Sequence, residues 1–182
     1  FGTVDIPAFE RSDAPGPSQL YHLSGNGRLT LLEDGLKFTN GLAFSADRRQ
    51  LYHCETFVGV FAYDWDGSAL TNRRKLLDKG DCDGMKVDVE GRIWVTGFRT
   101  PELTIISPQG GQYGALQIPA GGATNLWFGG EDGKDLYITA VTPVEVSDPS
   151  EIVVPSQPDS RLLKGRAPAS GLPVPKTKFQ LA

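Results

Sequence analysis

Three copies of one pattern decide the fold. The stretch DGMKVD (Asp83–Asp88) is followed by a short polar turn and the apolar run IWVT (Ile93–Thr96). Earlier, NGLAFS (Asn40–Ser45) precedes LYHC (Leu51–Cys54), and later TNLWFG (Thr124–Gly129) precedes LYIT (Leu136–Thr139). The matching positions Leu42, Met85 and Leu126 lie 43 and 41 residues apart. A period of about 40–45 residues built from short strands and tight turns is typical of β-propeller blades.

The composition agrees with this reading and excludes several classes of partner. The 182 residues are 39% hydrophobic and include 22 Gly and 13 Pro, which suits an all-β fold with many turns. The formal net charge of −4 gives no basic surface for nucleic acid, and no apolar run is long enough to span a bilayer. The two cysteines are too few for a disulfide scaffold. We therefore predict a cytoplasmic protein without a nucleic-acid or membrane partner.

The chain begins in the middle of a blade pattern. Its first residues, FGTV (Phe1–Val4), match the end of the second strand in the later copies. At about 43 residues per blade the chain supplies about four blades, and propellers have about 4–8. We expect residues 1–182 to form a single partial propeller domain whose N-terminal blades are missing, with a long loop at 143–160.

Turn residues and alternating apolar residues place the strands. Asn26-Gly27, Asp66-Gly67 and Gly110-Gly111 supply the positive backbone φ angles that short hairpin turns need. The aromatic residues Tyr52, Trp94 and Tyr137 hold one equivalent position and are predicted to pack between blades. The strands are predicted at residues 42–46, 51–56, 60–64, 85–88, 93–97, 103–107, 126–128 and 136–141, with one more at 161–164.

Two Asx-Gly pairs differ from the turn pairs in their phase. Asn40-Gly41 and Asp83-Gly84 both stand at the start of the innermost strand of their blades. Equivalent positions of successive blades converge on the central channel of a propeller. Amide and carboxylate oxygens are the ligands that Ca²⁺ and Mg²⁺ prefer, so the pair is a candidate metal site. The alternative interpretation is that both pairs only turn the chain into the strand.

The same residues resemble the gluconolactonase/regucalcin family of six-bladed propellers. The resemblance rests on TNGLAFS (39–45), DWDGS (64–68) with NRR (72–74), and DGMKVDVEGRIWV (83–95). It continues through TN (124–125), FGG (128–130), LYIT (136–139) and GLPVP (171–175). It covers nearly the whole chain apart from residues 143–160.

The resemblance implies a divalent cation at the top of the channel and hydrolysis of sugar lactones. It assigns two metal ligands, Asn40 and Asp83, and places the family's remaining glutamate ligand and its substrate-binding Arg-x-Asn before Phe1. The family usually has Pro where this chain has Cys82. The implied cation is Ca²⁺, with Zn²⁺, Mg²⁺ and Mn²⁺ as alternatives, and it would polarise the lactone carbonyl for attack by water. Asp83 is the predicted catalytic residue, as a ligand first and as a base second.

Three other functions stay open on the sequence. The chain could belong to a metal-dependent hydrolase of another ester or of an organophosphate. It could be a calcium-binding propeller without enzymatic activity, or a protein-interaction scaffold. A catalytic triad has no support, because no Ser or Cys stands at a nucleophile elbow. A scaffold would not need Asn40 and Asp83 at matching phases.

Overall fold

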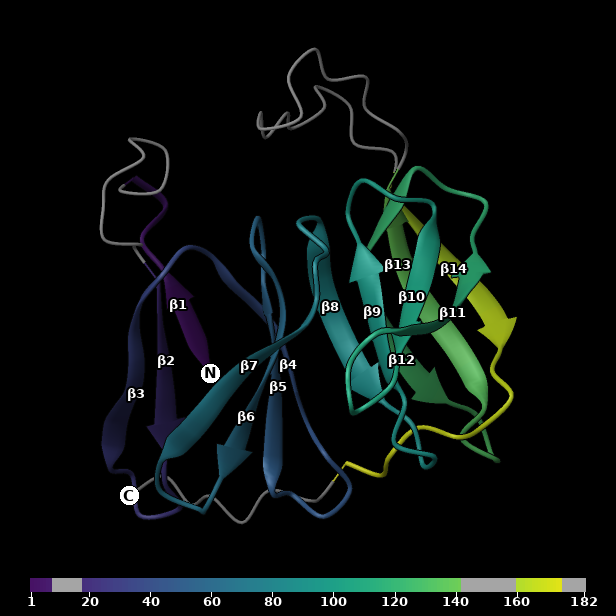
Figure 1. The fold of residues 1–182 in the computed structure, drawn as a ribbon. Helices are drawn as coiled ribbons and strands as arrows, with labels where there is room; N and C mark the ends of the chain where they lie inside the picture. Colours follow the sequence, from purple (N-terminus) through teal and green to yellow (C-terminus); the bar gives the residue numbers. More distant parts are fainter. Residues whose placement is uncertain (8–17, 142–159, 175–182) are drawn as a thin grey trace.

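The computed structural model describes residues 1–7, 18–141 and 160–174. These residues form four antiparallel sheets that follow one another along the chain (Figure 1). No helix longer than two turns occurs among the described residues before Pro143, and none in the described part has the length and hydrophobicity to cross a membrane. The predicted loop at 143–160 lies outside the described residues, except for Ser160.

Each sheet is one blade, and its strands lie side by side in sequence order. The first blade contains β1 (Gly2–Val4), β2 (Ser18–Leu23) and β3 (Leu29–Leu36). The second contains β4 (Thr39–Phe44), β5 (Gln50–Glu55), β6 (Gly59–Trp65) and β7 (Leu70–Leu77). The third contains β8 (Cys82–Val87), β9 (Ile93–Gly97), β10 (Glu102–Ile106) and β11 (Gln112–Gln117). The fourth contains β12 (Gly122–Gly129), β13 (Asp135–Val141) and β14 (Ser160–Arg166).

This architecture confirms the propeller prediction, with two differences in detail. Two of the four sheets have four strands, whereas the described residues of the first and fourth have three. The inner strands β4, β8 and β12 begin three or four residues earlier than predicted. A β-bulge interrupts each of these strands near its start, so the alternation of side chains becomes regular only after it.

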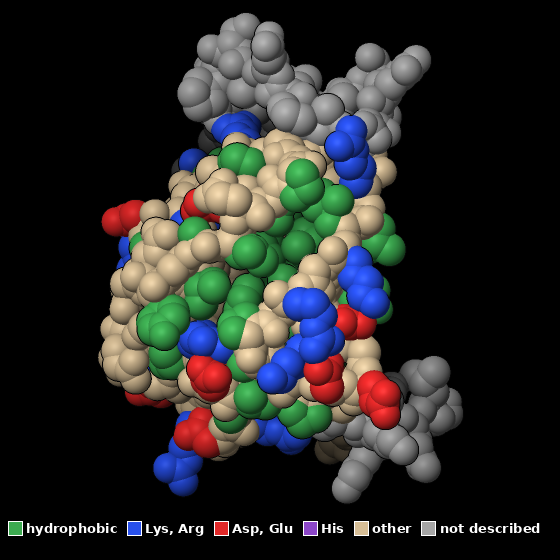
Figure 2. Space-filling model, turned by 90° about the vertical axis from the view of Figure 1, so that its right-hand side faces the viewer, with side chains coloured by type: hydrophobic (Ala, Val, Ile, Leu, Met, Phe, Trp, Pro, Cys, Tyr) green, Lys and Arg blue, Asp and Glu red, His purple; other side chains and the backbone are tan. Residues whose placement is uncertain are grey.

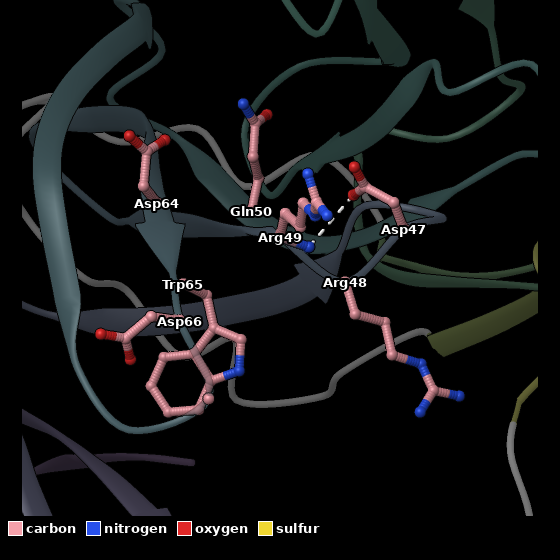
Figure 3. Close-up of a pocket in the computed structure, with 8 residues that line it drawn as sticks. Asp47, Arg48, Arg49, Gln50, Asp64, Trp65 and Asp66 are labelled. Atoms are coloured by element: carbon pink, nitrogen blue, oxygen red, sulfur yellow. Dashed lines mark hydrogen bonds between the residues drawn. The ribbon is translucent and has the colours of Figure 1, made fainter.

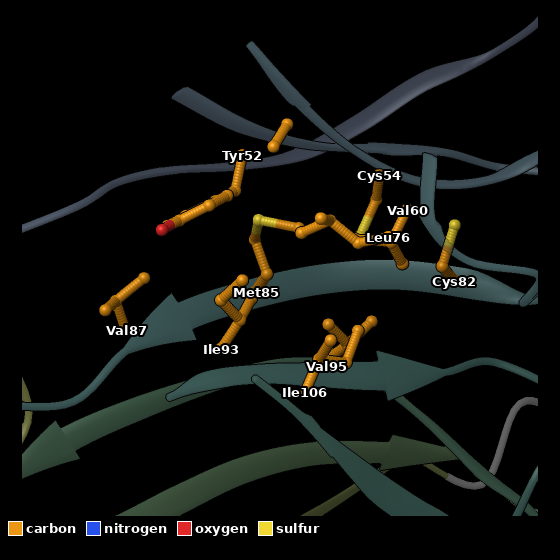
Figure 4. Close-up of a cluster of buried hydrophobic side chains, with 11 residues drawn as sticks. Tyr52, Cys54, Val60, Leu76, Cys82, Met85, Val87, Ile93, Val95 and Ile106 are labelled. Carbon is orange, nitrogen blue, oxygen red and sulfur yellow. The ribbon is translucent and has the colours of Figure 1, made fainter. Parts of the chain in front are cut away.

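Apolar side chains fill the spaces between the blades. Tyr52, Met85 and Val95 belong to the cluster between the second and third blades (Figure 4). Trp94 belongs to the cluster between the third and fourth blades, where its ring meets Phe128 edge-on. The prediction for Tyr52 and Trp94 is therefore confirmed. Tyr137 is only half-buried, and Lys164 Nζ lies 5.5 Å from its ring centroid.

The fourth blade presents an apolar face to the outside. Figure 2 shows hydrophobic side chains gathered on this side of the molecule, bordered by charged ones. Trp127 and Leu162 are the large apolar side chains exposed on β12 and β14. In a propeller ring such a face packs against the next blade. The segment after β14 runs back under the third blade, where Leu172 N donates to Val87 O at 2.9 Å.

Candidate functional site

The inner strands β4, β8 and β12 lie side by side, and they bring the two predicted site residues together. Asn40 is the second residue of β4 and Asp83 is the second residue of β8. The ladder between β4 and β5 shifts register between Thr39 and Leu42, and the ladder between β8 and β9 shifts between Cys82 and Met85. Each residue therefore stands in a bulge, a feature that re-aims side chains and occurs often beside active sites.

The glycine after each site residue lets neighbouring inner strands approach closely. A Cβ on Gly41 would lie 2.8 Å from Met85 N, and a Cβ on Gly84 would lie 2.7 Å from Thr124 O. Neither glycine has a positive φ angle, so neither is required for backbone freedom. Both glycines are therefore required for close packing, and this packing places Asn40 beside Asp83.

Asp83 is a carboxylic acid whose charged form is disfavoured by its surroundings. Burial raises the pKa of Asp83 from its ordinary 3.8 to about 6, a hydrogen bond with Asn40 lowers it in part, and the charge of Asp81 raises it further. A cation bound to the carboxylate would compensate this penalty, because an opposite charge favours the ionised form. The environment of Asp83 therefore suits a carboxylate that binds a positive ion.

Asp81, two residues before Asp83, differs from it because its carboxylate has a lysine and a threonine as partners. Its Oδ1 lies 2.9 Å from Lys79 Nζ, and its Oδ2 accepts a hydrogen bond of 2.7 Å from Thr100 Oγ1. Lys79 is buried and also donates to Thr100 Oγ1 at 3.0 Å. This network ties the segment before β8 to the loop after β9 and satisfies the charge of Asp81.

The buried residue Thr56 contacts the Asn40 side chain, although the sequence did not indicate it as a site residue. Thr56 follows β5, accepts a hydrogen bond of 3.2 Å from Asn40 Nδ2 and donates one of 2.6 Å to Cys82 O. The sequence does not show that the end of β5 contacts β8, so these two hydrogen bonds could be found only from the structure. The sequence shows only that Thr56 stands at the end of the strand that pairs with the Asn40 strand.

Glu55, the last residue of β5, is engaged outside the Asn40–Asp83 pair. Its carboxylate accepts a hydrogen bond of 2.8 Å from Lys37 N and pairs with Arg73. The Arg73 Nη1 atom also lies 3.6 Å from Glu33 Oε1, and the guanidinium group lies over the Phe61 ring. Glu55 therefore anchors the segment before β4 and the outer strand β7, and it stabilises the contact between the first two blades.

Both cysteines near the site are buried and free. Burial raises the pKa of the Cys54 thiol well above its usual value, and hydrogen bonding with Cys82 raises it further. Cys82 Sγ donates to Gly59 O at 3.5 Å. The Cys54 thiol is therefore a poor nucleophile and a poor metal ligand, because both roles need the thiolate. Cys82 is fully buried and packs in the cluster between the second and third blades.

A broad hollow of about 700 Å³ lies at the opposite end of the second blade, away from Asn40 (Figure 3). Asp47, Arg49, Asp64 and Trp65 are among its lining residues. Its acids are already engaged: Asp47 accepts from Arg49 N at 3.0 Å, and Asp64 pairs with Arg74 at 2.9 Å. Hydrogen bonds hold the pKa of both carboxyls below the ordinary value. The carboxylates that line this hollow therefore stabilise the turns around it, and the hollow is not a candidate reactive site.

Most of this chain matches a known protein family. The sequence profile of the family described as "SMP-30/Gluconolactonase/LRE-like region" matches residues 1–142. The chain belongs to this family.

Two relatives and one solved structure illustrate the range of the family. Regucalcin of Danio rerio is 36% identical over 129 residues, which are 66% of this chain and 44% of that protein. Pentonolactonase XacC of Haloferax volcanii is 31% identical over 135 residues, 70% of this chain and 46% of that protein. The structure of a luciferin-regenerating enzyme superposes with a TM-score of 0.75 at 26% identity, covering 95% of this chain and 60% of the other. The chain thus spans about half the length of the curated relatives it matches.

The residues of this SMP-30/gluconolactonase family member fit a hard divalent cation in part. Asn40 and Asp83 offer an amide and a carboxylate oxygen, the donor types that Ca²⁺, Mg²⁺ and Mn²⁺ prefer. The described residues contain no group of three or more His, Cys, Asp and Glu side chains that could hold a metal. The pair would therefore need further oxygen ligands beyond the His, Cys, Asp and Glu side chains of the described part.

Proposed function

We propose that this chain supplies two ligands, Asn40 and Asp83, to the divalent-cation site of a hydrolase that opens sugar lactones. The observation that carries the proposal is the meeting of these side chains in matching bulges of β4 and β8, with Asp83 buried enough to raise its pKa to about 6. The name of the relative pentonolactonase supports a lactone as substrate, and the name regucalcin supports calcium as the cation.

In this mechanism the chain holds the cation and orients the reacting groups. Asp83 would bind the cation through its carboxylate, and Asn40 would bind it through its amide oxygen. When bound, the cation supplies Lewis-acid stabilisation of the negative charge that develops on the lactone carbonyl oxygen. Water adds to the carbonyl carbon, the ring C–O bond breaks, and a hydroxy carboxylate and a proton are released. The main role of Asp83 is that of a metal ligand, and its role as a base is secondary, because a bound cation makes the carboxylate a weaker base.

The test is a proton-release assay on five- and six-carbon aldonolactones with the protein that carries this chain. We expect ring opening only with a divalent cation present, and Asp83→Ala should abolish it together with tight cation binding. Asn40→Ala removes a neutral ligand, so binding should weaken less while turnover falls. Asp66→Ala is the matched control, because that carboxylate serves only a turn.

Three outcomes separate the competing functions. Ring opening that survives chelation or Asp83→Ala would overturn the proposed mechanism. Cation binding without hydrolysis of any lactone would favour a calcium-binding propeller. Hydrolysis of an aryl ester or an organophosphate in place of lactones would keep the site and change the substrate class.

A further inference from the structure

The Thr56 hydroxyl lies between the two strands that carry the proposed ligands. Thr56 is 3% exposed and directly follows β5. Its Oγ1 donates a hydrogen bond of 2.6 Å to Cys82 O, the carbonyl directly before Asp83, and it accepts one of 3.2 Å from Asn40 Nδ2. One buried hydroxyl therefore contacts both the Asn40 side chain and the backbone beside Asp83.

The direction of these bonds determines which end of the Asn40 amide can face Thr56. A hydroxyl has one proton to donate, and here the Cys82 carbonyl takes it. Thr56 Oγ1 can then only accept, so it binds the NH₂ end of the amide and disfavours the oxygen end. The Asn40 Oδ1 is thereby the amide atom directed away from Thr56. The Asn40 side chain also hydrogen-bonds the Asp83 carboxylate, which can only accept from the amide NH₂, so both contacts use the nitrogen end and leave Oδ1 for a cation.

The turn that carries Thr56 is fixed from both sides. Thr56 N donates to Phe38 O at 2.9 Å, just before β4, and Phe57 N donates to Gly80 O at 2.7 Å, just before β8. Phe57 has a φ angle of 72°, a conformation that aromatic residues seldom adopt. Such a backbone persists only where its surroundings determine it. The hydroxyl of Thr56 is thus held in place independently of Asn40.

We propose that Thr56 is the positioning residue of the cation site: it holds the Asn40 amide by its nitrogen and reserves Oδ1 for a hard divalent cation. The inference rests on the proposed function for the identity of the ligand. Groups that orient a metal ligand in this way affect metal affinity although they do not touch the metal.

The chain contains a matched control for this role. Thr96 is also fully buried, and its Oγ1 donates a hydrogen bond of 3.1 Å to Gly84 O, a carbonyl of the same strand β8. Thr96→Val removes the same kind of bond from the same strand, but the hydroxyl it removes does not hold the Asn40 amide. Thr56→Ser keeps the hydroxyl at position 56 and should restore what Thr56→Val removes.

The experiment is a Tb³⁺ luminescence titration with Ca²⁺ competition on the wild type and these three variants. We expect Thr56→Val to weaken binding about 10-fold or more, and Thr56→Ser and Thr96→Val to keep the wild-type affinity. Equal affinity of Thr56→Val and wild type, or an equal loss in Thr96→Val, would overturn the inference while leaving the proposed function intact.

Crystal structures of the cation-free proteins give a second readout that does not depend on binding. The Asn40 nitrogen should stay on residue 56 in the wild type and Thr56→Ser, and the amide should turn in Thr56→Val. If the wild type binds no cation, the proposed function fails, and the orientation of Asn40 still decides the positioning role. An unchanged Asn40 amide in Thr56→Val would overturn it.

Discussion

Two Asp-Gly pairs of this chain have the same sequence and opposite physical states. In the turn after β6, Asp66 Oδ1 accepts hydrogen bonds of 2.8 Å from both Ser68 N and Ala69 N, and these bonds lower its pKa. Gly67 has a φ angle of 100° and nothing within 4 Å of a Cβ. On β8, burial raises the pKa of Asp83 to about 6, and Gly84 is in close contact with β12.

The comparison shows that the phase of a dipeptide within the repeat decides its role. In the turn, glycine supplies a backbone angle and the carboxylate satisfies backbone donors, so both residues serve the fold. On the inner strand, glycine allows close packing and the carboxylate is left with a costly charge. The second arrangement lowers the stability of the cation-free protein, and such a cost is typical of functional sites.

The largest effect is expected from the glycines. Gly84→Ala would place a Cβ 2.7 Å from Thr124 O and force β8 and β12 apart, lowering the free energy of unfolding by about 3 kcal/mol. In Gly67→Ala the new Cβ has no atom within 4 Å, so only the left-handed backbone conformation is unfavourable. The free energy of unfolding should fall by about 1 kcal/mol. Urea unfolding of the two variants measures the difference. An equal loss in both would show that close packing is not the reason for Gly84.

The charge of Asp83 predicts a stabilising substitution. Because the folded pKa lies above the unfolded value, the folded state binds the extra proton, and the unfolding free energy falls as pH rises from about 4 to 6. The difference between 3.8 and about 6 corresponds to at most about 3 kcal/mol. Asp83→Asn should therefore be more stable than wild type at pH 8 in a chelator, and equally stable near pH 4.

Thermal unfolding of both proteins between pH 4 and pH 8 checks this sign. Asp66→Asn is the control, and it should lose stability at pH 8 because its carboxylate accepts backbone hydrogen bonds. Added Ca²⁺ should stabilise the wild type and leave Asp83→Asn unchanged. An Asp83→Asn protein that is less stable than wild type at pH 8 without cation would contradict the account.

The smallest effect is expected at a third pair, Asp132-Gly133. Hydrogen bonding to Arg166 and to Lys134 N lowers the pKa of Asp132 to about 2. Stability from this group is present above pH 4 and is lost as pH falls toward 2. The ion pair with Arg166 is at the surface, so Asp132→Asn should lower the thermal midpoint slightly, and less in 1 M salt. A large or salt-independent change in the thermal midpoint would show that Asp132 resembles the buried Asp83 and not the turn residue Asp66.

The strands that could be predicted are those whose residues are mostly buried in the core. The strand at Ile93–Gly97 matches the prediction, and those at β5, β6, β10 and β13 match within about a residue. The outer strands β3, β7 and β11 were not predicted because they are largely exposed. The basic run Arg73–Lys75 lies within β7, where Arg73 pairs with the buried Glu55.

The candidate site divides in the same way. Asn40 and Asp83 could be predicted because the repeat gives both residues the same phase, and the family resemblance pointed to the same positions. Thr56, Asp81 and Lys79 could not, because their roles depend on contacts between loops that the repeat does not specify. Thr56 contacts Cys82 O of the next blade, and Asp81 and Lys79 contact Thr100 beyond β9. Their bonds cross between segments that are distant in sequence. A pattern along one strand contains no information about such contacts.

The most direct test of the central claim is a calcium titration by calorimetry of the wild type, Asp83→Asn and Asp66→Asn at pH 7.5. We expect wild type and Asp66→Asn to bind calcium with the same affinity. Asp83→Asn should bind at least about 100-fold more weakly, because it loses the charged ligand. Calcium binding by Asp83→Asn at the wild-type affinity would contradict the claim that the two Asp-Gly pairs differ in function.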